Sequence, residues 1–263
     1  MVDSRQIELI SSAALVSGDS SVLPNGDASE VEAAGTGRHH RVAGPPLHPR
    51  YPDLASLATA CTGCTACNLA SSRQHVVISR GNPAARLMLI GEGPGQQEDE
   101  TGQPFVGRAG QLLDAILASV GIDRDRDVFI CNVVKCRPPG NRKPTPEEMA
   151  SCRPWLSEQI RLVNPAIVLL AGATAMEGVL GLKGGITRLR GSWKQRDGRL
   201  YMPIFHPSYL LRNASKAKGS PKWLTWQDMQ LVCRTLDALA QPGEAGGCGA
   251  ADTAALPPRD DAV

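Results

Sequence analysis

The sequence predicts an α/β domain in which helices cover both faces of a mostly parallel sheet. Short runs of Val, Ile and Leu alternate with segments of helical periodicity, and strands buried on both faces have this continuous apolar character. The glycine-rich and polar loops follow the apolar runs. In a parallel sheet such loops meet beyond the carboxyl ends of the strands. We therefore expect a ligand site at that edge.

The individual elements follow from composition and periodicity. The apolar runs that predict strands cover residues 85–91, 127–134, 166–172 and 200–207. The segments that predict helices cover residues 108–120, 145–163, 173–181 and 221–240. The first helix places four apolar residues on one face, as an amphipathic helix does: Leu112, Leu113, Ile116 and Leu117. The second opens with Thr145 and Glu148, the spacing of a capping box.

The chain of 263 residues has room for one domain with flanking segments. Residues 1–50 are rich in Ser, Gly, Ala and Pro without a period, which predicts a disordered leader, and residues 241–263 predict a similar tail. The folded domain is expected at 51–240. The sequence starts without a signal-peptide pattern, and Glu177 interrupts its longest apolar stretch. We therefore expect a cytoplasmic monomer with no membrane partner.

Four cysteines form two widely separated pairs. Cys64 and Cys67 have C-x-x-C spacing, and Cys136 and Cys152 bracket a basic, proline-rich loop. In a cytoplasmic chain, clustered cysteines more often bind a metal than form disulfides. Four thiolates suit either Zn²⁺ or an iron–sulfur cluster, and the residues alone leave both open. Either group would fasten the basic loop to the start of the domain.

Charge is distributed unevenly along the chain. The net charge is only +2, but the segment from Cys131 to Thr235 contains 17 Lys and Arg against 6 Asp and Glu. Such an excess favours a polyanionic partner. The most basic loop, at residues 135–143, is therefore expected to face nucleic acid.

The loop after the first predicted strand, at residues 91–110, is rich in glycine. It lacks the G-x-x-x-x-G-K-[ST] pattern of a phosphate loop, so we expect no nucleotide cofactor. It carries three carboxylates, Glu92, Glu98 and Asp99, and one aromatic side chain, Phe105. Phe105 either stacks on a flat ring or fills the core.

Two further polar side chains lie near the carboxyl ends of other predicted strands. Asn132 is near the end of the second, and an amide that both donates and accepts can read the edge of a base. His206 is near the end of the fourth. Either residue could also be structural at such a position.

Three segments together resemble one family. They read GEGPGQQED…GQPFVGRAGQLLD, CNVVKCRPPGNRKPTPEE…C and HPSYLLR. This set resembles the family 4 uracil-DNA glycosylases, the iron–sulfur branch of their superfamily, over about residues 64–240. The resemblance implies a three-layer α/β/α sandwich around a short, mostly parallel sheet. It also implies a [4Fe–4S] cluster held by Cys64, Cys67, Cys136 and Cys152, and DNA containing uracil as the partner.

The resemblance also implies roles for residues in the pocket. Phe105 would stack on an extruded uracil, Asn132 would hydrogen-bond its edge, and His206 would donate to uracil O2. Glu92 and Gly93 would contribute backbone contacts and help to place the attacking water. Family 1 enzymes have an Asp in the equivalent first motif, so here the group that activates water stays open among Glu92, Glu98 and Asp99.

DNA contacts are expected around this pocket. Arg142, Lys143 and Arg212 would grip phosphates, and Leu210 or Leu211 would fill the space left by the extruded nucleotide. The expected activity is monofunctional removal of uracil, leaving an abasic site. Two alternatives stay open: a non-catalytic iron–sulfur protein that binds nucleic acid or senses redox state, and a zinc-stabilised hydrolase of nucleotides.

Overall fold

The structure, a computed structural model, describes residues 51–240. The predicted leader (1–50) and tail (241–263) lie outside the described residues. Within the described part, none of the helices is both long and apolar enough to cross a membrane.

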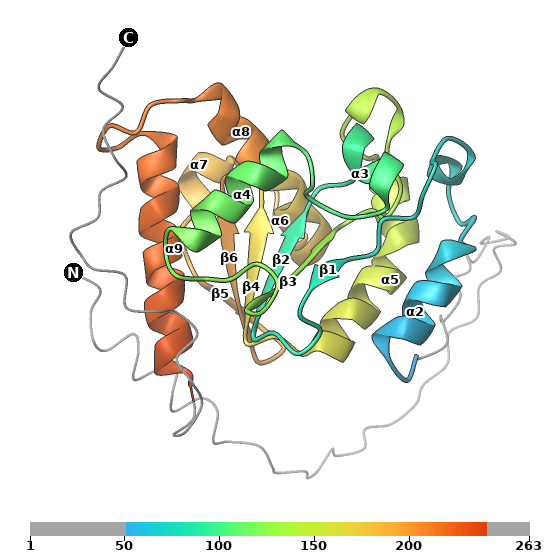
Figure 1. The fold of residues 1–263 in the computed structure, drawn as a ribbon, viewed down its shortest axis with the longest axis horizontal. Coiled ribbons are helices and arrows are strands. Elements are labelled where there is room, and N and C mark those ends of the chain that lie inside the picture. Colours follow the sequence, from blue (N-terminus) through green and yellow to red (C-terminus); the bar gives the residue numbers. More distant parts are fainter. Residues whose placement is uncertain (1–50, 241–263) are drawn as a thin grey trace, which may run out of the picture. The chain divides into compact units, whose positions relative to one another are not determined.

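A six-stranded sheet forms the centre of the domain, in the order β1-β3-β2-β4-β6-β5 (Figure 1). The strands are β1 (Arg80–Gly81), β2 (Leu87–Gly91), β3 (Val128–Asn132), β4 (Ile167–Ala171), β5 (Lys194–Arg196) and β6 (Arg199–Ile204). The four inner strands pair in parallel, and the short edge strands β1 and β5 pair antiparallel to their neighbours. The mostly parallel sheet predicted from the apolar runs is therefore confirmed.

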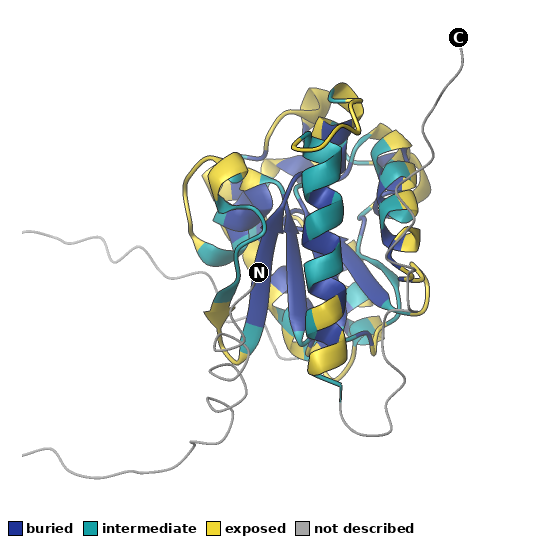
Figure 2. Cartoon of the chain, turned by 90° about the vertical axis from the view of Figure 1, so that its left-hand side faces the viewer, coloured by how far each residue is buried: buried dark blue, intermediate teal, exposed yellow. Residues whose placement is uncertain are grey.

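Helices cover both faces of this sheet. The α-helices are α2 (Leu54–Thr62), α3 (Gln96–Thr101), α4 (Arg108–Ala118), α5 (Pro146–Val163), α6 (Ala173–Leu180), α7 (Ile186–Leu189), α8 (Pro207–Arg212) and α9 (Pro221–Ala238). Helix α5 packs against α2 and α6, and α4 packs against α8 and α9. Figure 1 shows α2 and α9 on opposite sides of the sheet, and Figure 2 shows buried strands behind helices that are more exposed. The three-layer α/β/α fold class is confirmed.

Alternation along the strands explains the two layers of core. Met88 and Ile90 of β2 belong to one large apolar cluster, which also contains Leu57 of α2 and Trp155 of α5. Successive side chains of a strand point to opposite faces, so Leu89 points to the other face of the sheet. Leu89 is also fully buried, because helices cover that face too. Continuous apolar strands are thus the expected product of a sheet covered on both sides.

The carboxyl ends of the inner strands place the loops that matter for function. Gly91, the last residue of β2, lies in register with Asn132, the last residue of β3. Helix α5 starts as predicted: the Thr145 hydroxyl accepts a hydrogen bond from Glu148 N, and the Glu148 carboxylate accepts one from Thr145 N. This cap fixes where the basic loop after β3 ends.

Candidate active site and cysteine cavity

A pocket of about 280 Å³, open to solvent, lies at the carboxyl edge of the sheet. Its walls include all five residues predicted to bind or act on the base: Glu92, Gly93, Phe105, Asn132 and His206. They come from loops after β2, β3 and β6 and are far apart in sequence. The structure thus brings these five residues together.

Phe105 forms one wall of this pocket and is held in an unusual backbone conformation. Its φ is 55°, in the left-handed region that a bulky residue rarely adopts. A Cβ on Gly91 would lie 2.4 Å from Phe105 Cζ, and a Cβ on Gly110 would lie 1.7 Å from Phe105 O. Only glycine therefore fits at these two positions. The Phe105 side chain is 6 % exposed and packs 5.9 Å from the His206 ring, centroid to centroid.

Glu98 holds the loop that carries Phe105. One of its oxygens accepts hydrogen bonds from Val106 N (3.0 Å) and Gly107 N (2.9 Å), and the other accepts from Gly95 N (3.1 Å). With both oxygens bonded to backbone amides, Glu98 is a support for the loop although it also lines the pocket.

The three carboxylates left open as water activators have different surroundings. Asp99 is 2 % exposed, accepts from Gln74 N and His75 N, and is absent from the pocket walls. Glu92 lines the pocket, and its Oε2 accepts a hydrogen bond of 2.5 Å from the Thr174 hydroxyl at the start of α6. Of the three carboxylates, Glu92 is the one that lines the pocket and has an oxygen that accepts no hydrogen bond from a backbone amide.

Asn132 is buried, at 2 % exposed, yet its side-chain oxygen has no hydrogen-bond partner within the described residues. Buried polar atoms are nearly always paired. This oxygen lies where a Cβ on Gly91 would approach to 2.5 Å, so the glycine leaves room for it. An unpaired amide oxygen in the wall of a pocket is suited to accept a hydrogen bond from a ligand.

His206 is arranged to donate through Nε2. Its Nδ1 accepts from Ser208 N at 3.2 Å and lies 2.8 Å from the Ser208 hydroxyl, so the ring proton belongs on Nε2. Burial, together with the nearby Arg212 charge and against the opposing Glu98 charge, lowers the pKa of His206 to about 4. The ring is therefore a neutral donor at pH 7.

The residues predicted to bind DNA phosphates differ in their ion pairs and in their exposure. Arg142 lies at the mouth of the pocket and is paired with Glu148 at 2.6 Å, and Lys143 is paired with Glu177 at 2.8 Å. Arg212 is exposed at the end of α8. Lys135, which belongs to the basic loop expected to face nucleic acid, is 1 % exposed, so that expectation is wrong for this residue.

Leu210 and Leu211, the two candidates for filling the space left by the extruded nucleotide, differ in their exposure. Leu210 is fully buried and packs the inner side of α8, whereas Leu211 is 37 % exposed. The exposed Tyr209 stacks against Phe205, with ring centroids 5.0 Å apart. Of the two leucines, only Leu211 presents its side chain to a partner.

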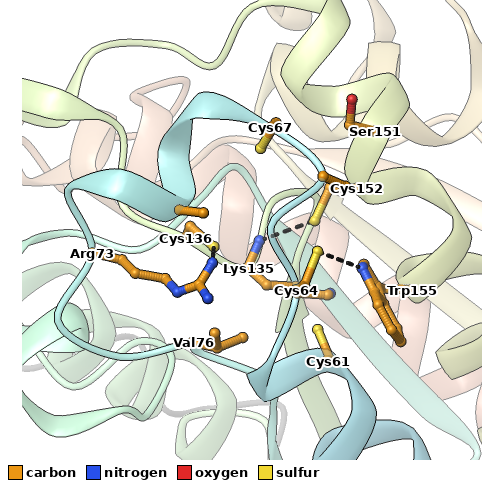
Figure 3. A pocket seen from close by; sticks show the side chains of 12 residues that line it. Cys61, Cys64, Cys67, Arg73, Val76, Lys135, Cys136, Ser151, Cys152 and Trp155 are labelled. Carbon is orange, nitrogen blue, oxygen red and sulfur yellow. Dashed lines mark hydrogen bonds between the residues drawn. The ribbon is translucent and has the colours of Figure 1, made fainter.

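The four predicted cluster cysteines share the walls of one narrow cavity of about 10 Å³ (Figure 3). Cys64 and Cys67 follow α2, Cys136 follows β3, and Cys152 lies in the second turn of α5. Cys61, at 2 % exposed, lines the same cavity. Among residues 51–240, no three Cys, His, Asp or Glu side chains converge closely enough to hold a single metal ion.

Three of the four sulfurs receive N–H donors, each at 3.3 Å. Arg73 Nη1 donates to Cys136, Trp155 Nε1 donates to Cys64, and Lys135 N donates to Cys152. Burial raises the pKa of Cys152 to about 12, while the Lys135 charge opposes that rise. N–H donors aimed at sulfur favour its anionic, metal-bound form, so this donor set fits a thiolate-bound cluster.

Sequence reasoning missed two residues of these sites. Thr174 directly follows the β4 strand and its Gly172 turn, so the rule that selected Asn132 and His206 applies to it as well. Trp155 carries no comparable signal, because a tryptophan in an amphipathic helix is normally a core residue. Cys131 is fully buried in β3.

Comparison with known proteins agrees with this geometry. Residues 78–230 match the family model described as the uracil DNA glycosylase superfamily. A protein of Thermotoga maritima named type-4 uracil-DNA glycosylase is 53% identical over 148 residues, covering 55% of this chain and 76% of that protein. Proteins with the same name from Sulfurisphaera tokodaii (39% over 155 residues; 56% and 70% covered) and Archaeoglobus fulgidus (38% over 152 residues; 55% and 76% covered) are also similar. The chain belongs to the uracil DNA glycosylase superfamily.

Proposed function

We propose that this protein removes uracil from DNA by hydrolysing its N-glycosidic bond and leaves an abasic site. The observation that supports this most directly is the convergence of Phe105, Asn132 and His206 on one pocket. An aromatic face, an unpaired amide oxygen and a neutral imidazole donor are the groups that a flat, hydrogen-bonding base requires. The relatives named above carry the name of this activity.

The base reaches the pocket only after it leaves the helix, because the glycosidic bond is inaccessible inside the base stack. Phe105 then offers a ring on which uracil stacks. The Asn132 amide lies beside this ring and pairs with the polar edge of the base, with Oδ1 accepting its N–H. Gly93 lines the pocket without a side chain, which lets the base approach the backbone.

Bond cleavage transfers the electron pair of the C1′–N1 bond to the uracil ring, and negative charge develops on O2. His206 Nε2–H donates a hydrogen bond to that oxygen. A preorganised donor of this kind is typically worth about 3–4 kcal/mol of barrier. Water adds to C1′ and gives up one proton, and the uracil anion is protonated, so that the products are a C1′ hydroxyl and neutral uracil. We assign the placement of this water to Glu92, whose free oxygen accepts a hydrogen bond from it.

DNA binding is assigned to the exposed rim. Arg142, Lys143 and Arg212 contact phosphates, and Leu211 enters the gap left by the extruded nucleotide. Arg142 and Lys143 keep considerable exposure, 44% and 53% of their side chains, despite their carboxylate partners. Phosphate contacts of this type position the protein on DNA without reading sequence.

The cofactor is assigned to the cysteine cavity. Cys64, Cys67, Cys136 and Cys152 would hold a [4Fe–4S] cluster, and its thiolate bonds would fasten the 136–152 segment to the residues after α2. A cluster is a body that its ligands surround, whereas zinc draws four ligands to one point. Cysteines on the walls of a shared cavity therefore favour the cluster.

One experiment tests the proposed activity. The purified protein is incubated with an oligonucleotide containing a single uracil, without added metal or nucleotide, and the product is treated with alkali. We expect free uracil, strand breakage only after alkali, and no reaction with a thymine-containing control. DNA binding without uracil release, together with an intact cluster, would favour the non-catalytic or redox-sensing alternative. The monomeric state and cytoplasmic location stay predictions.

A further inference from the structure

Lys135 is a lysine in the interior of the domain. Its side chain is 1 % exposed, and it is the largest of the fully buried side chains. Lysine is almost never buried without a partner, because an ammonium outside water loses a large solvation energy. The ion pairs between described side chains do not include Lys135. What balances its charge therefore needs an explanation.

The ammonium lies between the two sites. Its Nζ donates a hydrogen bond of 2.6 Å to the backbone carbonyl of Asn132, the residue whose amide oxygen faces the base pocket. The same side chain lines the cysteine cavity, where Figure 3 draws it among the sulfurs. Lys135 therefore touches the wall of one site and supports a residue of the other.

The surroundings of Lys135 are rich in sulfur. Lys135 lines the cavity together with Cys61, Cys64, Cys67, Cys136 and Cys152. Four thiolates would leave a loaded metal site with a net negative charge. A loaded cysteine site would thus supply the anion beside this buried cation.

The backbone of Lys135 is equally constrained. Its N–H donates to Cys152 Sγ at 3.3 Å, and its carbonyl accepts from Val77 N at 2.8 Å. The next residue, Cys136, is a predicted ligand. A change in the cysteine site therefore reaches Asn132 through one residue that is anchored at both its backbone and its side chain.

We propose that Lys135 is a positioning residue that couples the cysteine site to the base pocket. The negative charge of the loaded site holds the ammonium in the interior, and the ammonium holds the Asn132 carbonyl, so the amide that reads uracil is placed correctly only when the cysteine site is filled. This proposal rests on the proposed function and adds a dependence of base recognition on the cluster.

The test uses the cluster-loaded protein and free uracil as the probe. Visible circular dichroism of the cluster is recorded while uracil fills the pocket of the wild type. Coupling predicts that saturating uracil changes this spectrum. A spectrum that stays unchanged at saturation overturns the proposal, and this measurement does not depend on whether any variant folds.

Variants add a second readout. Lys135→Met should weaken free-uracil binding at least tenfold and abolish the spectral response, while Lys135→Arg, which keeps the charge, should restore part of both. Lys194→Met, on the edge strand β5, is the matched control and should leave both unchanged. Wild-type affinity and response in Lys135→Met contradict the proposal. A wild type without iron would instead overturn the cofactor assignment, and one that releases no uracil from DNA would overturn the proposed function itself.

Discussion

The Thr174 hydroxyl donates a hydrogen bond of 2.5 Å to Glu92 Oε2, joining the start of α6 to the loop after β2. This bond occupies one carboxylate oxygen and fixes the direction of the other. Thr174 is 4 % exposed, so water does not readily replace it.

Replacing this hydroxyl should slow uracil release. A hydrogen bond to a charged group contributes about 1.5–3 kcal/mol, so Thr174→Val should lower the single-turnover rate by roughly 10- to 100-fold. Thr174→Ser, which keeps the hydroxyl, should stay near the wild type. Equal rates for the valine and serine variants would show that the bond does not position Glu92 for the reaction.

His206→Ala should slow the chemical step by about 10²–10³-fold, because its donor acts mainly in the transition state. Affinity for uracil-containing DNA should change little, since many other contacts hold the strand. Single-turnover kinetics at saturating protein separate the two quantities. A wild-type rate in this variant would remove His206 from the mechanism.

The low pKa of His206 has a consequence for stability. Its folded pKa of about 4 lies below its ordinary value of 6.5, so between these values the unfolded chain binds more protons. The contribution of neutral His206 to the free energy of unfolding is complete above pH 6.5 and decreases as the pH is lowered below that value. From pH 6.5 to 5, the wild type should lose roughly 1–2 kcal/mol more than His206→Gln in denaturant unfolding. Parallel losses in both proteins would contradict the assigned pKa.

Two substitutions distinguish a cysteine that binds the cluster from a neighbouring cysteine that does not. Cys67→Ser should lose the brown colour and most of the iron, because an iron without its thiolate destabilises the cluster and the loop bound to it. Cys61→Ser should keep about four irons per chain, as expected of an intact cluster. Cys61 lines the same cavity, so iron analysis of this pair decides between them. The reverse result would exchange Cys61 for Cys67 in the ligand set.

Removing both Arg142 and Lys143 should weaken DNA binding equally for uracil-containing and normal duplexes. The salt slope should fall by about one to two units, with the smaller value expected because both side chains already have carboxylate partners. Binding titrations at several salt concentrations measure this slope. A loss confined to uracil-containing DNA would show that the loop recognises the lesion.

Much of the fold was predictable because its strands are buried on both faces. The four inner strands appear as apolar runs, and Thr145 with Glu148 marks the start of α5. The edge strand β5, with the sequence Lys194–Gln195–Arg196, has no apolar run because it is partly exposed and pairs on only one side. Two-residue β1 is too short for any periodicity.

The pocket residues were predictable from their places after strands, but their supports were not. Adjacent carboxylates such as Glu98 and Asp99 have similar sequence surroundings, and only the helix α3 that carries them turns one toward the Phe105 loop and the other toward His75. The burial of Lys135 was not predicted, because a lysine in a basic loop is normally exposed. Its burial depends on sulfurs contributed by distant segments.

The left-handed backbone of Phe105 is held by contacts within the chain itself, since Glu98 supports its loop and Gly91 and Gly110 enclose it. The conformational cost of this arrangement is therefore met when the chain folds, before any DNA is encountered. An arriving base finds a rigid platform and loses little binding energy to rearrangement of the pocket. The slow step before chemistry should then be the opening of the DNA, so bases in weak pairs or in single strands should be processed fastest.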